Sequence, residues 1–276
     1  MLRIDLHLHS TFSDGIFSPK ALTDKLARAK VSVASLTDHD SVDGVALFLA
    51  SCRKRAIRAV SGVEFSARHD GILHILGYRF DIEDAALKAA LDKNKRARHE
   101  RNLQICQNLR NLGFDVNLED VRALAGSDVI GRPHLARLMV NRGYASSLKE
   151  AFDKYLKKGG AAYAPRPLLP PEECIRLIRG AGGLPVMAHP LQTTPDLDDL
   201  PPLLEKLKDY GLWGLECWAS GSSPGEIYRT LGTADRFGLY PTAGSDFHGG
   251  DHTAHGVGVV VEESLLPWAR FCGGLQ

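Results

Sequence analysis

Short runs of apolar and β-branched residues alternate with helix-like segments along most of this chain, and this alternation limits the folds that it can adopt. Strands that alternate with helices are typical of α/β proteins, in which helices cover a parallel sheet or barrel. Ser18 and Pro19 illustrate the pattern, because they suit the N-cap and the first position of a helix. We expect strands at residues 3–9, 33–37, 59–63, 73–78, 184–188, 213–217, 240–243 and 256–261.

The middle third of the chain replaces this alternation with a series of helical patterns. Apolar residues recur there at three-residue steps, close to the spacing of one helix face, at Leu103, Cys106, Leu109 and Leu112. We expect helices at residues 85–112, 118–125, 133–141, 147–157 and 171–179.

These helical patterns divide the chain into two parts. Residues 84–179 are interpreted as a helical insertion that contributes to the substrate pocket, and residues 1–83 and 180–276 are interpreted as one α/β barrel. Within the insertion, a dense basic run at residues 93–101 is typical of a solvated helix face.

The composition excludes some classes of function. Lysine and arginine total 34 against 33 aspartate and glutamate, so no global charge attracts nucleic acid or a membrane surface. Any anion must therefore be bound locally. No apolar run reaches the roughly 18 residues that a membrane span requires, and the opening MLRIDLHLHS lacks the features of a secretory leader.

The cysteines indicate a reducing compartment. They are scattered singly, without a CxxC pair, at Cys52, Cys106, Cys174, Cys217 and Cys272. An odd and dispersed set is typical of free thiols and not of a disulfide framework or a zinc ribbon. We therefore expect a cytoplasmic protein.

Titratable residues gather where the expected strands end. Asp5, His7 and His9 in DLHLHS share one face of the first strand, because side chains two residues apart point the same way. Most of the others follow an apolar run directly, whereas His74 begins its own strand. The nine candidate metal ligands are His7, His9, Asp14, His39, Glu64, His74, His189, Asp246 and His248.

The strand ends of a parallel barrel meet at one mouth, so we expect these nine residues to form one cluster. Imidazole and carboxylate ligands without thiolate suit Mn²⁺, Fe²⁺ or Zn²⁺ more than Mg²⁺ or Ca²⁺. Nine ligands are too many for one ion, and they suit two ions, or three if Glu64 bridges. Asp5 is interpreted as a group that orients a ligand histidine. Glu216 also ends an expected strand, and it either orients a ligand histidine or has no role at the metal site.

The motifs DLHLHS, TDHDS, GVEFS, AHP and SDFH together resemble the polymerase-and-histidinol-phosphatase (PHP) family of phosphoesterases. The resemblance covers about residues 1–80 and 184–260. It implies a distorted seven-stranded (β/α) barrel with a trinuclear metal site, and we expect Mn²⁺ there, with Fe²⁺ or Zn²⁺ as alternatives. One ion would lie near His7, His9, Glu64 and Asp246. A second would lie near Glu64, His74 and His189, and a third near Asp14, His39 and His248.

The insertion and its segments GRPHLA and AYAPR resemble one subgroup of this family. That subgroup hydrolyses nucleoside 3′,5′-bisphosphates and short 5′-phosphorylated oligonucleotides. The resemblance implies a nucleotide substrate, with short single-stranded RNA or DNA as a further partner. The sequence indicates no protein partner.

The expected chemistry is attack of a metal-activated hydroxide on a phosphate monoester. We expect the catalytic group to comprise Asp14, His39, Glu64, His134, Asp246 and His248. Arg132 either engages phosphate oxygens near a helix start, with Pro133 at the first helical position, or is an ordinary surface arginine.

Other residues near these motifs are candidate substrate contacts. His134 either donates a hydrogen bond to phosphate or protonates the leaving oxygen, and Ser66 either binds phosphate or caps a turn. Lys157 and Lys158 either reach a second phosphate or interact favourably with the dipole at the C-terminal end of a helix. The remaining histidines are interpreted as surface or core residues, at His69, His99, His252 and His255.

Three other functions remain open at this point. An amidohydrolase on a similar barrel would bridge its metals with a carbamylated lysine, and the matching place here holds Glu64. A histidinol phosphatase would apply the same chemistry to another monoester. A metal-holding scaffold or nucleic-acid-binding module would not turn over substrate, and the near-zero net charge disfavours passive binding of nucleic acid.

Overall fold

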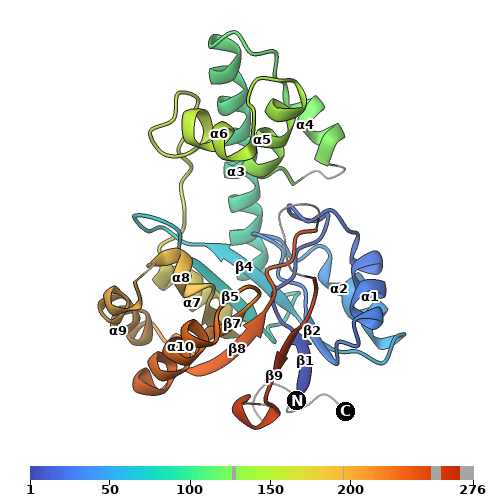
Figure 1. The fold of residues 1–276 in the computed structure, drawn as a ribbon, viewed down its shortest axis with the longest axis vertical. Helices are drawn as coiled ribbons and strands as arrows, with labels where there is room; N and C mark the ends of the chain where they lie inside the picture. The colour runs from blue at the N-terminus through green and yellow to red at the C-terminus, as the bar shows by residue number, and fades with distance from the viewer. Residues whose placement is uncertain (126–128, 195, 250–255, 268–276) are drawn as a thin grey trace.

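The computed structural model describes residues 1–125, 129–194, 196–249 and 256–267, and its fold is α/β, as expected. Figure 1 shows two strand-containing halves side by side below a separate group of helices. Each expected strand overlaps an observed one, with one change. Residues 59–63 were expected to form a single strand, and they are divided between two.

The first sheet has the order β3-β2-β1-β9. Its strands are Arg58–Val60 (β3), Val33–Ser35 (β2), Leu2–Asp5 (β1) and Val259–Val261 (β9). The first three are parallel, and β9 pairs antiparallel with β1 at the edge.

The second sheet has the order β4-β5-β6-β7-β8. Its strands are Gly62–Ser66 (β4), His74–Tyr78 (β5), Leu184–Met187 (β6), Gly214–Ala219 (β7) and Tyr240–Gly244 (β8). β6, β7 and β8 are parallel, whereas β5 is antiparallel to both of its neighbours. The start of β5 therefore lies at the sheet edge where β4 and β6 end.

Isolated bridges connect the two sheets at both seams. Leu8 pairs with Phe247 beyond the ends of β1 and β8, and His39 pairs with Glu64 beyond the end of β2. In the described residues, regular pairing gives these two sheets, and the expected seven-stranded barrel stays a prediction. The chain changes sheets at Gly62, where a Cβ atom would lie 2.2 Å from Oγ of Ser35, so only glycine permits this close approach.

Helices cover the outside of the two sheets (Figure 1). They are Pro19–Arg28 (α1), Val45–Arg53 (α2), Pro171–Gly180 (α7), Pro190–Thr193 (α8), Pro201–Asp209 (α9) and Pro224–Phe237 (α10), with short 3₁₀ turns at Leu197–Asp199 and Glu263–Leu265. Ser18 caps α1 with Pro19 at its start, as the sequence predicts. The apolar faces of α7 and α10 pack on the larger hydrophobic core.

The helices of the middle third form a second core. They are Ala85–Asn111 (α3), Leu118–Ala125 (α4), Arg132–Asn141 (α5) and Leu148–Ala151 (α6), followed by a π-helical turn at Phe152–Leu156. The long helix α3 joins both cores, because Leu87 packs in the larger one and Ile105 in the second. The exact division of the chain at residues 84 and 179 stays a prediction.

Two further observations concern the described residues. None of their helices combines the length and the apolar character needed to cross a membrane. Four cysteines, Cys52, Cys106, Cys174 and Cys217, are buried free thiols, as expected. Cys272, His252 and His255 lie outside the described residues.

Candidate metal centre and arginine pocket

Eight imidazole and carboxylate side chains reach one rim of the two sheets from the ends of six strands, and Asp14 reaches it from a loop. Seven of the eight lie on or just beyond the end of a strand that points toward this rim. His74 reaches the rim from the start of β5, because that strand runs in the opposite direction. The structure thus brings together all nine residues that the sequence identified as candidate ligands.

Four groups of ligand atoms lie within 4.8 Å of one another. They are His9, Asp14, His39 and His248; His7, His9 and Asp246; His7, Glu64 and His189; and His39, Glu64 and His74. Asp14, His39 and His248 lie together as expected, and His9 joins them. How the groups divide among individual ions stays a prediction.

Glu64 lies at the centre of these groups and is fully buried. Its Oε1 lies 2.7 Å from Nδ1 of His74 and 3.2 Å from Nε2 of His189. Its Oε2 lies 2.7 Å from Nδ1 of His39 and 3.3 Å from Nε2 of His9. One carboxylate therefore touches several groups at once, which is the geometry that a bridging ligand requires.

Several buried atoms at this rim lack the partners that buried polar atoms normally have. Among the described residues, six buried atoms of the candidate ligands have no hydrogen-bond partner: Nε2 of His7, Nε2 of His9, Oδ1 of Asp14, Nδ1 of His39, Oε2 of Glu64 and Nδ1 of His189. All six belong to residues of the groups above. Divalent cations would satisfy them, so the residues present fit a metal centre.

The charges of the cluster also favour cations. Although burial opposes ionisation, His39, His74 and His7 hold the pKa of Glu64 well below its usual range. Burial likewise disfavours the charged form of His248, yet the carboxylates of Asp14 and Asp246 raise its pKa to about 10. The cluster thus holds carboxylates in the ionised form that binds metal.

Glu216 positions two of the candidate ligands. Its Oε1 lies 3.1 Å from Nδ1 of His7, which leaves Nε2 of that ring free to face the cluster. Its Oε2 accepts a hydrogen bond from the backbone N–H of His189 at 2.7 Å. Carboxylates in this arrangement fix the orientation of ligand histidines.

Asp5 has a different role from the one expected. Its carboxylate accepts hydrogen bonds from the backbone N–H and hydroxyl of Ser245 at 2.8 and 2.6 Å, and from the backbone N–H of Gly258 at 2.7 Å. It contacts the backbone of His7 and not the ring of a ligand histidine. Asp5 therefore anchors the segment that precedes Asp246, and Glu216 orients the ring.

Asp38, in the TDHDS motif, has a structural role that the sequence around it does not indicate. It accepts hydrogen bonds from the backbone N–H of Ser10 at 2.7 Å, and from the hydroxyls of Ser10 and Ser13 at 2.7 and 2.6 Å. These bonds fix the loop that carries Asp14. Two serines and one aspartate, distant in sequence, gave no local signal of this contact.

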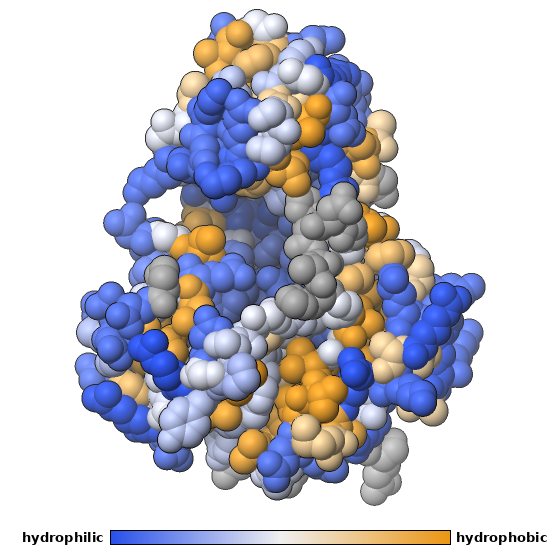
Figure 2. Space-filling model, viewed as in Figure 1, coloured by the Kyte–Doolittle hydropathy of each residue, from blue (hydrophilic) through white to orange (hydrophobic). Residues whose placement is uncertain are grey.

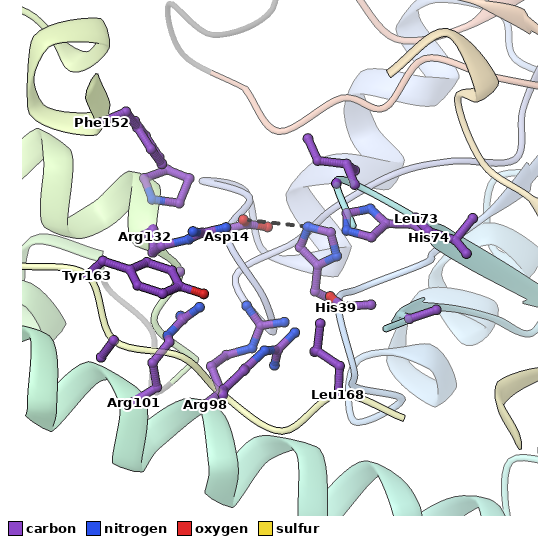
Figure 3. Close-up of a pocket in the computed structure, with 18 residues that line it drawn as sticks. Asp14, His39, Leu73, His74, Arg98, Arg101, Arg132, Phe152, Tyr163 and Leu168 are labelled. Carbon is purple, nitrogen blue, oxygen red and sulfur yellow. Dashed lines mark ion pairs between the residues drawn. The ribbon is translucent and has the colours of Figure 1, made fainter. Parts of the chain in front are cut away.

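A pocket of about 270 Å³ opens beside the metal-ligand cluster, between the sheets and the helical middle third. Figure 2 shows the surface hollowed at this level, and Figure 3 shows the side chains that line it. Asp14, His39 and His74 form one wall. Four arginines from the middle third face them, at Arg98, Arg101, Arg132 and Arg166. We call these four residues and the space they enclose the arginine pocket.

The arginine pocket corrects the interpretation of residues 93–101 as a solvated helix face. Arg98 and Arg101 are only 7% and 8% exposed, and both line the pocket. The same face of α3 contributes Asn94, which is also buried. The segment that returns from the middle third, AYAPR, covers this part of α3 and contributes Tyr163 and Arg166 to the pocket.

The remaining candidates are placed as follows. Arg132 and Ser66 line the pocket, and α5 begins at Arg132, so Pro133 is its second residue and not its first. Nδ1 of buried His134 accepts a hydrogen bond from the N–H of Gly131, a residue that lies against Asp14. Lys158 is outside the pocket lining, because its ammonium is exposed and lies 2.9 Å from the carboxylate of Asp70.

Lys157, His69 and His99 also lie outside the candidate metal groups. Lys157 pairs with Asp153 on the exposed surface of the π-helical turn. His69 and His99 are exposed, and neither belongs to a candidate metal group in the described residues.

A family model for the PHP domain matches residues 5–163, which is more than half of the chain. A 3′,5′-nucleoside bisphosphate phosphatase from Chromobacterium violaceum is 32% identical over 274 residues, which cover 98% of this chain and 95% of that protein. A 5′-3′ exoribonuclease from Haemophilus influenzae is 32% identical over 247 residues, which cover 89% and 90%.

Solved structures are similar over nearly the whole fold. A Chromobacterium violaceum protein named as an amidohydrolase, with bound sulfate and no metal, has a TM-score of 0.88 at 31% identity and covers 97% of this chain and 94% of its own. A candidate metal-dependent phosphoesterase from Bifidobacterium adolescentis has a TM-score of 0.82 at 27% identity and covers 95% and 93%. The similarity therefore includes the helical middle third.

Proposed function

This chain belongs to the PHP domain family, and from that premise we propose that it is a metal-dependent phosphatase for nucleoside 3′,5′-bisphosphates. The 3′-phosphate is the group removed, so that adenosine 3′,5′-bisphosphate would yield AMP and phosphate. Short 5′-phosphorylated oligonucleotides are the second proposed substrate. Both proposals are supported by relatives that cover most of the chain.

The observation that carries this proposal is the arginine pocket beside the metal-ligand cluster. Asp14 and His39 belong to the cluster and also line the pocket, so one ligand can reach both regions. A phosphate monoester at the metal ions needs no second cationic pocket, whereas a molecule with two phosphates does. A guanidinium group can donate two parallel hydrogen bonds to the oxygens of one phosphate, so arginines are well suited to bind the second phosphate.

The size of the pocket agrees with a small ligand. Small-molecule sites commonly enclose about 300–1,000 Å³, and this pocket of about 270 Å³ lies near the lower limit. Its walls also include Ile72, Phe152 and Tyr163. These apolar and aromatic side chains suit the nucleoside between two phosphates.

The metal ligands in this proposal are the nine residues at the rim, with Glu64 in the bridging position. The histidine-rich set favours Mn²⁺, with Fe²⁺ or Zn²⁺ as alternatives. When bound, two or three such ions supply a hydroxide nucleophile at neutral pH and neutralise charge on the phosphate. The protein side chains then bind and orient the substrate.

His134 donates a hydrogen bond in this scheme. Because Nδ1 accepts a hydrogen bond from Gly131, the neutral ring carries its hydrogen on Nε2. Burial lowers the pKa of His134 and keeps the ring neutral near pH 7. A neutral imidazole is a weak acid, so stabilisation of a phosphate oxygen suits His134 better than protonation of the leaving oxygen.

A phosphate-release assay with the Mn²⁺-loaded enzyme tests the proposal. The panel comprises adenosine 3′,5′-bisphosphate, AMP, histidinol phosphate, p-nitrophenyl phosphate and a 5′-phosphorylated trinucleotide. We expect the highest kcat/KM for the bisphosphate and loss of turnover in chelator. A preference for histidinol phosphate, or equal rates with all monoesters, would remove the nucleotide assignment.

The amidohydrolase alternative is tested in the same assay with amide and lactone substrates. Amidohydrolases on similar barrels use a carbamylated lysine as the metal bridge, and the bridging position here holds Glu64. No lysine lines the arginine pocket in the described part of the chain. Metal-dependent amide hydrolysis that is faster than phosphate release would favour the amidohydrolase over the phosphatase.

A further inference from the structure

One buried carboxylate, that of Asp40, holds two of the four pocket arginines. Its Oδ2 lies 2.6 Å from the guanidinium of Arg98 and 3.0 Å from that of Arg166. Its Oδ1 accepts hydrogen bonds from the side chain of Asn94 at 3.1 Å and the backbone N–H of Ser66 at 3.4 Å. Asp40 is fully buried, so these contacts are shielded from water.

Asp40 joins three segments that are distant in sequence. It follows His39 directly, in the loop after β2, and its backbone has a φ of 52°. Arg98 lies on α3, and Arg166 lies on the segment that returns from the helical middle third to α7. A single carboxylate therefore fixes two guanidinium groups relative to an imidazole of the metal-ligand cluster.

In the described part of the chain, no acidic side chain pairs with the other two arginines of the pocket. The guanidinium of Arg101 contacts the side-chain oxygen of its neighbour Asn102, and that of Arg132 contacts the carbonyl of Leu156 at 3.4 Å. Neither forms a salt bridge within the described residues. The pocket thus contains two held guanidinium groups and two that are available to a ligand.

We propose that Asp40 is a positioning residue that sets specificity for doubly phosphorylated substrates by holding Arg98 and Arg166 in place. The fixed pair aligns the pocket with the metal-ligand cluster, and Arg101 and Arg132 bind the phosphate that is not hydrolysed. This inference rests on the proposed function, because it assigns the second phosphate of the same substrate to the arginine pocket.

The effect of removing the charge of Asp40 distinguishes positioning from simple electrostatics. Without this carboxylate the pocket becomes more positive, so electrostatics alone predicts tighter binding of anions. If Asp40 instead acts by positioning, its loss misaligns two guanidinium groups and weakens binding. Misplacement of a positioned group by about 1 Å can change rates by roughly 100-fold.

The first experiment compares Asp40→Asn with the wild type on two substrates. For adenosine 3′,5′-bisphosphate we expect KM to rise roughly 10- to 100-fold. For p-nitrophenyl phosphate, which has one phosphate, we expect kcat/KM to stay within about a factor of three. Equal losses on both substrates would identify Asp40 as a general structural residue and overturn its role in specificity.

The second experiment measures binding of inorganic phosphate to the full chain in chelator, by calorimetry. The dissociation constant should rise roughly tenfold or more in Asp40→Asn. Unchanged or tighter binding would overturn the proposal. If the wild type binds phosphate but does not hydrolyse nucleotides, the proposed function fails while the role of Asp40 is still tested. If the wild type does not bind phosphate, the arginine pocket is not an anion site and the proposal fails.

Two further variants separate geometry from folding. Arg98→Lys keeps the positive charge but loses the planar fork, so phosphate binding should weaken as it does in Asp40→Asn. Asp70→Asn is the matched control, because it also removes an aspartate that pairs with a cation of the middle third, Lys158. Asp70 lies on the exposed surface, so this variant should behave as the wild type.

Discussion

Nδ1 of His74 lies 2.7 Å from Oε1 of Glu64, although the two residues belong to neighbouring strands that run in opposite directions. In the register of this pair His74 faces Ser66, at the end of β4, and Glu64 lies two residues earlier. The first residue of β5 therefore reaches the same rim as the last residues of the parallel strands. The reversal of this strand explains why His74, unlike the other candidate ligands, begins its strand.

Substitution of Asp14 or His248 should disrupt the candidate metal group that contains both residues. We expect Asp14→Asn and His248→Gln to lower kcat/KM by roughly 100-fold or more, because metal ions stabilise transition-state charge by several kcal/mol. Metal analysis should find less bound metal than in the wild type. Asp24→Asn is the control, because Asp24 pairs with Arg55 away from the cluster. Near-normal rates in both cluster variants would exclude this group from the mechanism.

Glu216 should matter for metal affinity although it belongs to none of the candidate metal groups. Its carboxylate fixes the ring of His7 and the backbone of His189. We expect Glu216→Gln to weaken Mn²⁺ binding by roughly 10- to 100-fold, which a competition titration with a chelating dye would measure. An unchanged affinity would mean that packing alone orients His7.

Arg132 and Lys158 should differ in their effect on the substrate. Arg132 lines the pocket, whereas Lys158 is exposed and pairs with Asp70. We expect Arg132→Ala to raise KM for adenosine 3′,5′-bisphosphate about tenfold, since a charge-assisted hydrogen bond contributes roughly 1.5–3 kcal/mol. Lys158→Ala should leave the kinetics unchanged. The reverse pattern would place the second phosphate at the outer surface.

The ion pairs of Asp40 should make stability depend on pH. Although burial opposes ionisation, Arg166 and Arg98 hold the pKa of Asp40 below its usual value of 3.8. A lowered pKa in the folded state contributes stability above pH 3.8 that is lost as the pH falls below this value.

Chemical denaturation of the wild type and Asp40→Asn measures this effect. The difference in their free energy of unfolding should shrink by about 1 kcal/mol between pH 6 and pH 3, because the unfolded wild type binds a proton there and the folded one does not. A difference that is constant over this range would show that Asp40 is not ionised in the folded protein.

The ligand residues of the candidate metal centre could be identified from the sequence, because the signal is local. His7 and His9 share a strand face through the two-residue period, and Asp246 follows an apolar run directly. The same local patterns predicted the α/β class and the helix α3. These features depend only on residues that are close together in the sequence, so they can be recognised without the tertiary structure.

Other features depended on packing between distant segments. The passage between sheets at Gly62 and the reversal of β5 have no local signature that distinguishes them from an ordinary strand. The basic run of α3 is typical of a solvated face, yet its Arg98 and Arg101 are buried. Asp40, distant in sequence, pairs with Arg98 and with Arg166 of the returning segment.

Residue type and strand position are local properties, and for this reason the candidate metal ligands could be predicted from the sequence alone. The tertiary structure decided which cations are buried and which carboxylate holds them. Burial of a charge is favourable only when a partner of opposite charge is present, and here that partner is 58 residues away from one arginine and 126 from the other.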